Sequence, residues 1–252
     1  MSSIVLITGA TSGFGKSCAQ LFAEKGHRLI LIGRRADRLE KLAATLKESY
    51  NTETHLISVD IRNQDAITTS IYNLPTPWQD IAILINNAGL AAGRDYFEEA
   101  NLDDWNEMID TNVKGFLYVS QAVAKVMASR KKGHIINIGS TAGRVVYEKG
   151  NAYCATKYAV DALNQSMRID LLRHGIKVTA VNPGAAETEF SLVRFKGDQE
   201  TAASVYAGIK PLTPADVAEV IYYTTTLPSH VCINDLTITC LQQADSVYIN
   251  RK

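Results

Sequence analysis

A glycine-rich turn near the start of the chain constrains the fold most strongly. It reads Thr8-Gly9-Ala10-Thr11-Ser12-Gly13-Phe14-Gly15 and follows an apolar run, Ile4–Thr8, that predicts a buried strand. The residues after it, through about Lys25, have a helical pattern. Glycines let the backbone approach a ligand closely, and a helix N-terminus offers free N–H groups to a phosphate. We therefore expect dinucleotide binding at this turn, although its Gly-x-x-x-Gly-x-Gly spacing leaves a plain turn as the alternative.

Apolar runs and helical patterns then alternate along the chain. Runs that predict strands lie at 28–32, 55–59, 81–85, 135–138, 177–181 and 237–241. Such alternation is typical of a parallel sheet with helices on both faces. The 252 residues show no break in composition, so we expect one doubly wound α/β domain over 1–252, with about seven strands. The segment at about 185–210 is short of regular structure and is predicted to be a lid over the site, called the lid below.

The composition excludes several classes of protein. Lys plus Arg and Asp plus Glu number 26 each, which argues against nucleic acid or an anionic membrane as the main partner. The four cysteines have no metal-ligand or redox spacing, so we expect no metal. The chain starts without a basic leader or cleavage site, and no apolar run approaches the roughly 18 residues of a membrane span. We therefore expect a soluble cytoplasmic protein.

Three residues in the middle of the chain predict a proton-transfer site. Tyr153 and Lys157 are one helical turn apart and share a face, and Ser140 follows the strand predicted at 135–138. A tyrosine has an ordinary pKa of roughly 10, and a neighbouring ammonium favours its phenolate. Tyr153 would then transfer a proton, Lys157 would tune it and Ser140 would hold an oxygen. Alternatively, the tyrosine is a packing residue and the lysine its solvated neighbour.

Other candidate residues follow predicted strands at the edge where an open α/β sheet binds its ligand. Arg34 and Arg35 come after the second strand, where an acid would favour NAD and arginine favours the 2′-phosphate of NADP, although a solvated arginine pair is possible. Asp60 either contacts adenine or caps the next helix. Further candidates at this edge are Asn86-Asn87-Ala88-Gly89 and Pro183-Gly184.

Asn112 lies in the middle of a long predicted helix, 102–130. Asparagine and glycine both disfavour helix interiors, and Gly115 follows closely. We therefore predict that the helix is locally distorted around Asn112. A simple packing kink at Gly115 is the alternative.

Together these motifs resemble the short-chain dehydrogenase/reductase family over essentially the whole chain. The matching positions, in order, are Thr8-Gly9 with Gly13 and Gly15, Asn86-Asn87-Ala88-Gly89, Asn112, Ser140, Tyr153-x-x-x-Lys157 and Pro183-Gly184. Stretches that resemble the NADP-dependent 3-hydroxy acid dehydrogenases of this family include Gly33-Arg34-Arg35, Thr188-Glu189-Phe190-Ser191 and Val193-Arg194-Phe195-Lys196-Gly197-Asp198. The resemblance implies a Rossmann-type fold, NADP as cofactor, and oxidation of serine, L-allo-threonine and related 3-hydroxy acids.

The resemblance also implies a role for each residue. Tyr153 is the general acid/base, Lys157 lowers its pKa and holds the nicotinamide ribose, Ser140 bonds the reacting oxygen, and Asn112 holds a relay water. The implied cofactor contacts are Gly9, Thr11, Ser12, Gly13, Phe14, Gly15, Arg34, Arg35, Asp60, Ile61, Asn87, Ala88, Gly89, Tyr153, Lys157, Pro183, Gly184 and Thr188. Two departures are the turn at 185–188, which is a residue shorter than in that group, and Ser12, where many NADP-preferring relatives have a basic residue.

The substrate is the least determined feature of the sequence. Ser140 and Tyr153 would contact its reacting oxygen, and a carboxylate would suit a bidentate arginine, either Arg194 in the lid or Arg144 just after Ser140. Two other functions remain open: a carbonyl reductase of bulkier ketones, sugars or pterins, and a dinucleotide-binding regulator without turnover. The presence of Ser140, Tyr153 and Lys157 disfavours the regulator. By resemblance alone, we also expect a homotetramer.

Overall fold

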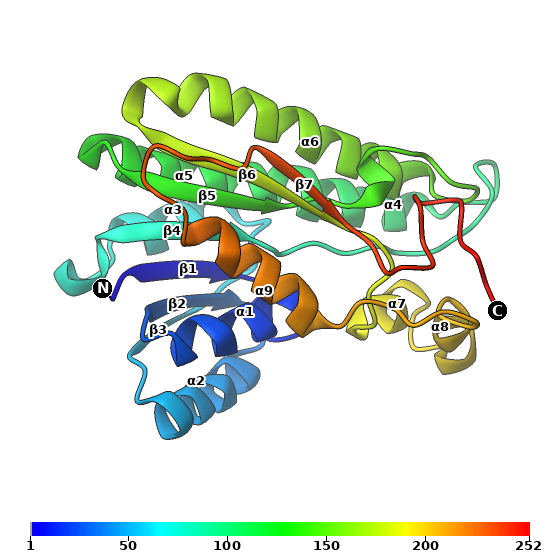
Figure 1. Ribbon diagram of the computed structural model, residues 1–252, viewed down its shortest axis with the longest axis horizontal. Coiled ribbons are helices and arrows are strands. Elements are labelled where there is room, and N and C mark those ends of the chain that lie inside the picture. Colours follow the sequence, from blue (N-terminus) through cyan, green and yellow to red (C-terminus); the bar gives the residue numbers. More distant parts are fainter. Residues whose placement is uncertain (1) are drawn as a thin grey trace.

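The computed structural model describes residues 2–252, with seven strands in one parallel sheet of order β3-β2-β1-β4-β5-β6-β7 (Figure 1). The strands are β1 Ile4–Thr8, β2 Arg28–Gly33, β3 Thr54–Ser58, β4 Ile81–Asn86, β5 Gly133–Ile138, β6 Ile176–Pro183 and β7 Asp235–Ile238. The predicted parallel α/β fold is confirmed. The last strand begins and ends earlier than the 237–241 that the sequence predicts.

Helices cover both faces of this sheet (Figure 1). One face carries α1 Gly13–Glu24, α2 Ala36–Tyr50 and α9 Pro214–Thr225, and the other carries α3 Gln64–Tyr72, α4 Leu102–Ile109, α5 Phe116–Arg130 and α6 Asn151–Leu171. Side chains of a strand alternate between faces, so Val5 and Ile7 of β1 join one apolar cluster while Ile4 and Leu6 join the other. All four are buried, as expected for a sheet covered on both sides.

The sheet order reverses at β1, which pairs with β2 on one side and β4 on the other. The ends of β1 and β4 are joined there by polar groups. The Thr8 hydroxyl accepts hydrogen bonds from the backbone N–H groups of Asn87 (3.0 Å) and Ala88 (2.9 Å), and the Asn87 side chain donates to the Thr8 carbonyl (2.9 Å). An open α/β sheet binds its ligand outside the carboxyl ends of its strands, at the point where the strand order reverses.

The long helix predicted at 102–130 is interrupted by one wide turn, a π-helix over Asp110–Gly115 between α4 and α5. The predicted distortion around Asn112 is therefore confirmed. Gly115 lies in the same turn and packs closely against Ile61, because a Cβ there would lie 2.8 Å from Cγ1 of Ile61. Wide turns of this kind often lie at functional sites.

The lid was predicted to be short of regular structure, and the structure differs from this prediction. It contains two short helices, α7 Glu189–Arg194 and α8 Gln199–Ser204, which lie beyond the carboxyl ends of the strands (Figure 1). The hydroxyl of Thr188 caps α7 by accepting from the N–H of Phe190, and the carboxylate of Asp198 caps α8. Helices this short have too few turns to show an apolar period.

Within residues 2–252, no helix has the length and apolar character needed to cross a membrane. The same residues contain no group of three or more His, Cys, Asp or Glu side chains placed to hold a metal ion. The four cysteines are free thiols.

Candidate active site

A pocket of about 470 Å³ opens at the carboxyl ends of the strands. Most residues that the sequence singled out line it: Gly9, Thr11, Ser12, Gly13, Phe14, Arg34, Arg35, Asp60, Ile61, Asn87, Ala88, Gly89, Ser140, Tyr153, Lys157, Pro183, Gly184, Thr188 and Arg194. Four candidates do not line it, namely Gly15, Asn86, Asn112 and Arg144. Strand ends, glycine turn and lid thus meet in one place.

The glycine turn is folded tightly against the end of β4. Gly9 has a φ of +64°, which favours glycine, and its carbonyl accepts from the Asn87 side chain (3.2 Å). Gly15 lies behind the turn, where a Cβ would come within 2.3 Å of the Gly9 carbonyl oxygen. The N-cap residue of α1, Ser12, makes no side-chain capping bond. The first N–H groups of α1 are therefore available to an anion.

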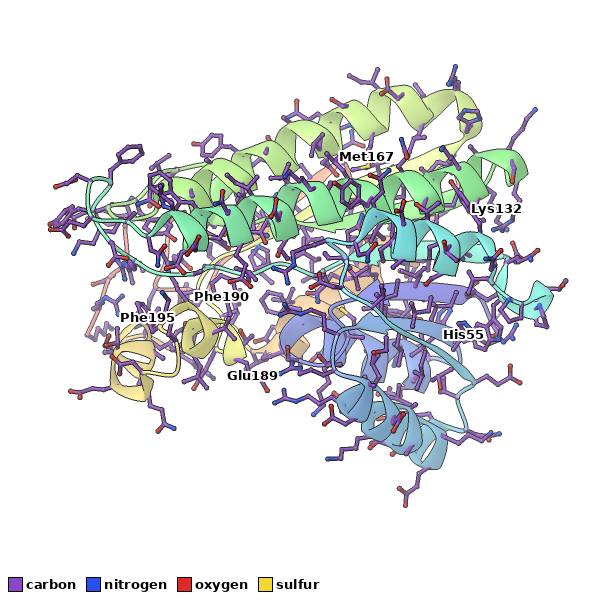
Figure 2. All side chains as sticks on the ribbon, turned by 180° about the vertical axis from the view of Figure 1, so that it is seen from behind. His55, Lys132, Met167, Glu189, Phe190 and Phe195 are labelled. Carbon is purple, nitrogen blue, oxygen red and sulfur yellow. The ribbon has the colours of Figure 1, made fainter. Side chains whose placement is uncertain are left out.

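Two arginines border the pocket at the end of β2. Arg35 donates from Nη2 to the Thr11 hydroxyl (3.1 Å), and Arg34 lies 3.9 Å from the Asp60 carboxylate. Both side chains are exposed, so a phosphate from solution can reach them. Arg35 also lies 3.8 Å from Glu189, whose carboxylate Arg38 of α2 binds at 3.1 Å. Figure 2 labels Glu189 on the lid, on the side that faces α2.

Asp60 does not cap the following helix, so that alternative was wrong. The cap of α3 is Asn63, whose side chain accepts from the N–H of Ala66. The Asp60 carboxylate is instead bound by the Arg62 guanidinium, at 2.6 Å from Nη2. Partial burial favours a higher pKa of Asp60, but hydrogen bonds and charge from Arg62 and Arg34 more than offset this and keep its pKa below the ordinary value.

Tyr153 and Lys157 are both buried at the N-terminal end of α6. Lys157 Nζ donates to the Ile138 carbonyl at the end of β5 (3.0 Å) and lies 5.9 Å from the centre of the Tyr153 ring. Ser140 follows β5, and its Oγ accepts from the N–H of Ala142 (3.1 Å). The three predicted residues therefore lie together beside the pocket.

Burial and charge oppose each other at this site. Burial raises the pKa of Tyr153 and outweighs the hydroxyl of Ser140 and the charge of Arg194, both of which lower it. Burial also lowers the pKa of Lys157 to about 8. The sequence assigned the stabilisation of the phenolate to Lys157, and the structure adds the guanidinium of Arg194, 5.6 Å from the centre of the Tyr153 ring.

Arg194 is a buried guanidinium in the pocket wall. Its Nη1 donates to the Tyr147 hydroxyl (2.7 Å) and its Nε to the Gly93 carbonyl (3.2 Å). It forms no ion pair with a carboxylate of the described chain, 2–252. Phe190 of the same helix, labelled in Figure 2, packs edge-on against Tyr153 with ring centres 5.5 Å apart. A buried charge without an acidic partner is costly unless a ligand supplies one.

Arg144, the other candidate for a substrate carboxylate, lies outside the pocket. It pairs with Asp161 of α6 (3.0 Å) and with Asp235 of β7. Its charge is therefore already compensated by two acids. The suggestion that Arg144 binds substrate is wrong for this geometry.

Asn112 holds the backbone beside the pocket. Its Oδ1 accepts from the N–H of Leu90 (2.8 Å), and its Nδ2 donates to the Leu90 carbonyl (2.7 Å) and to the Thr156 hydroxyl (3.1 Å). The side chain thus joins the loop after β4 to α6, one residue from Lys157. These contacts give Asn112 a positioning role, whereas the resemblance implied a relay water.

We expect Asn112→Ala to destabilise the fold by about 2–4 kcal/mol, because it leaves two buried backbone groups of Leu90 without partners. Urea unfolding followed by circular dichroism measures the change. Asn101→Ala is the matched control, because it removes an exposed asparagine cap on α4. Equal losses in the two variants would contradict this role for Asn112.

Several pocket residues were missed by sequence reasoning: Arg94, Thr111, Tyr147, Tyr206, Gln243, Ser246 and Arg251. Tyr147 lies in the irregular stretch after Ser140 and could have been considered on that ground. Thr111 neighbours Asn112, and its buried hydroxyl has no hydrogen-bond partner. Gln243, Ser246 and Arg251 belong to the last dozen residues, which no motif connects with the site.

Comparisons with known proteins agree with this geometry. The family model for short chain dehydrogenases matches residues 3–198. An NADP-dependent 3-hydroxy acid dehydrogenase of Salmonella typhi is 46% identical over 242 residues, 96% of each chain. Sulfoacetaldehyde reductase 2 of Chromohalobacter salexigens is 44% identical over 249 residues, 98% of each chain.

A solved structure, the closed form of serine dehydrogenase complexed with NADP+, superposes with a TM-score of 0.91. It is 45% identical and the match covers 96% of each chain. These findings confirm the resemblance seen in the sequence. The chain belongs to the short-chain dehydrogenase family.

Proposed function

We propose that the protein oxidises the 3-hydroxyl group of small 3-hydroxy acids with NADP and catalyses the reverse reduction. The observation that carries the proposal is Arg194, a buried cation without an acid, facing the same pocket as Tyr153. A carboxylate held there by bidentate hydrogen bonds would complete the charge pair. The names of the relatives, a 3-hydroxy acid dehydrogenase and a serine dehydrogenase, support this reading.

The residues present fit NADP. Gly9 and Gly15 leave no space for a Cβ, so the turn is tight; the N-terminus of α1 has no side-chain cap, and Arg34 and Arg35 border the same pocket. The unpartnered Thr111 hydroxyl offers a further polar contact. When bound, NADP supplies the hydride acceptor. The chain's own residues must then take up the proton of the substrate hydroxyl.

Tyr153 is the proposed proton acceptor. In the reductive direction the same phenol would donate the proton. Ser140 lies beside it and would hold the reacting oxygen, while Arg194 would anchor the carboxylate and fix the orientation of the substrate. Burial lowers the pKa of Lys157 to about 8, which still leaves it mostly charged at neutral pH, and this positive charge favours loss of the tyrosine proton. Phe190 and the lid would exclude water from above Tyr153.

We expect Arg34→Ala and Arg35→Ala each to weaken NADP binding by about 10–100-fold, because each removes a charged hydrogen-bond donor to the 2′-phosphate. NAD, which lacks this phosphate, is expected to bind almost unchanged. Fluorescence titration with both reduced cofactors measures the two affinities. Arg38→Ala is the matched control, since Arg38 binds Glu189 and does not line the pocket. Equal losses for the two cofactors would contradict the assignment.

The proposed activity is tested by following NADPH formation with L-serine, L-allo-threonine and 3-hydroxypropionate. An uncharged alcohol of similar size provides the comparison. We expect kcat/KM for the acids to exceed that for the alcohol by about 30-fold or more, given 2–5 kcal/mol for a buried charged contact. Equal kcat/KM values would favour the alternative, a carbonyl reductase of ketones, sugars or pterins.

A second candidate reaction is reduction of an aldehyde that carries a sulfonate. Arg94 also lines the pocket, and its guanidinium lies 5.9 Å from the centre of the Tyr147 ring, while that of Arg194 lies 5.5 Å from the same centre. Two guanidinium groups suit an anion with three oxygens, and one relative is named a sulfoacetaldehyde reductase. Consumption of NADPH with sulfoacetaldehyde tests this candidate, and absence of consumption rejects it.

We further propose that 185–210 acts as a lid and that the chain assembles as a homotetramer. Exposed apolar side chains on α5 and α6 support assembly: Leu117, Tyr158 and Ile169 are 39%, 42% and 73% exposed. Such a surface suits contact with a second copy. Light scattering in solution tests the assembly, and a monomeric mass would reject it.

A further inference from the structure

The turn that follows β6 is held in place by distant parts of the chain. Backbone N–H groups donate from Gly184 to the Ile238 carbonyl (2.8 Å) and from Glu187 to the Leu212 carbonyl (2.9 Å). The Ala186 carbonyl accepts from the Tyr206 hydroxyl (2.9 Å). A second side chain also contributes, because the N–H of Ala185 donates to Oε1 of Gln243 at 2.7 Å. The last ten residues of the chain therefore supply one of the contacts that hold the turn.

Gln243 is itself firmly fixed. Its side chain is buried, its Nε2 donates to the Asp245 carbonyl (2.9 Å), and its backbone bridges to Ile249 in a short antiparallel pair. A Cβ on Gly184 would lie 2.1 Å from the Gln243 Oε1. Only a glycine at 184 lets the amide oxygen approach this closely. The turn and the glutamine thus fit one another without free space.

The turn lies at the reacting end of the pocket. It follows β6, which pairs with β5, and Ser140 follows β5. The N–H of Gly139 donates to the Val181 carbonyl (2.8 Å), which fixes the two strand ends together. Pro183 and Gly184 line the pocket with Tyr153, whereas Arg34 and Arg35 lie beyond the glycine turn at β2, on the other side of β1.

We propose that Gln243 is a positioning residue for hydride transfer, acting through the backbone of the turn at 183–188. By holding the Ala185 N–H, it fixes the wall against which the nicotinamide end of NADP would lie. A small displacement of that wall changes the distance between reacting carbons, to which the rate is very sensitive. The inference rests on the proposed NADP site, but the fixing of the turn itself is a property of the unliganded chain.

Gln243→Met tests the proposal, because methionine has a similar volume and offers no comparable acceptor. Gln242→Met is the matched control. The neighbouring Gln242 also ties the end of the chain to the lid, accepting from the Lys210 N–H (2.8 Å) and donating to the Gly208 carbonyl (3.1 Å), but it does not touch the turn. Tyr206→Phe, which removes one hydroxyl contact to the same turn, serves as a second variant if Gln243→Met fails to fold.

The first readout is hydrogen exchange in the protein without cofactor. We expect Gln243→Met to accelerate exchange in the peptide covering 183–188 by about tenfold or more, since the hydrogen bond that holds the Ala185 N–H in this partly buried turn is lost. Gln242→Met should leave this peptide unchanged. Unchanged exchange in Gln243→Met, or equal acceleration in both variants, overturns the proposal.

The second readout is the isotope effect with serine deuterated at C3. We expect kcat of Gln243→Met to fall about 10-fold or more, with a larger primary isotope effect and an NADPH dissociation constant within about threefold of the unaltered protein. A fall in kcat without a larger isotope effect overturns the positioning role. If the unaltered protein neither binds NADPH nor oxidises serine, the proposed function fails, while exchange still reports whether Gln243 holds the turn.

Discussion

Tyr153→Phe is expected to lower kcat for serine oxidation by about 10²–10⁴-fold, the usual contribution of a positioned acid or base. The change removes only the hydroxyl, and the remaining ring keeps its edge-on contact with Phe190, 5.5 Å between centres. NADPH affinity is therefore expected to stay within a few-fold of the unaltered protein. Steady-state rates of NADPH formation and fluorescence titration of NADPH measure the two quantities.

Tyr147→Phe is the matched control for this prediction. It also removes one buried tyrosine hydroxyl from the pocket wall, the one that accepts from Arg194. We expect its main effect on KM for the acid, through a less firmly held guanidinium. Retention of more than about a tenth of kcat by Tyr153→Phe would show that another group takes the proton, and the proposed mechanism would be wrong.

The features that the sequence predicted well are those set by local patterns. Each apolar run became a strand, and the polar residues immediately after the runs had to meet at one edge because the strands are parallel. The distortion at Asn112 followed from two poor helix formers in one turn. For Tyr153 and Lys157, one helical turn of spacing sufficed to place both beside the pocket.

The features that the sequence could not predict depend on partners far along the chain. Arg144 and Arg194 looked equivalent, and only the fold brings Asp161 and Asp235 to Arg144 while leaving Arg194 without an acid. Asp60 and Asn63 are both capping residue types three positions apart, and the geometry of α3 selects Asn63. The contribution of Gln243 was hidden for the same reason, because its partner Ala185 lies 58 residues away.

Arg194→Met is expected to raise KM for serine about 30-fold or more, with a much smaller change for an uncharged alcohol. The reason is the loss of a buried charged contact of about 2–5 kcal/mol to the substrate carboxylate. Methionine keeps much of the apolar stem, so the packing of α7 is largely retained. Steady-state kinetics with both substrates measure the ratio. Arg144→Met is the matched control, since Arg144 pairs with acids outside the pocket, and it should leave both KM values nearly unchanged.

The pH dependence of the same variant separates anchoring of the substrate from tuning of Tyr153. The guanidinium of Arg194 lowers the pKa of Tyr153, which burial raises. Oxidation needs the phenolate, so kcat/KM rises with pH through the pKa of Tyr153. Removing the positive charge favours the neutral phenol and raises this pKa. The rising limb of Arg194→Met should therefore move to higher pH, even with the uncharged alcohol. An unmoved limb would contradict the electrostatic coupling, and equal KM changes for acid and alcohol would contradict the carboxylate anchor.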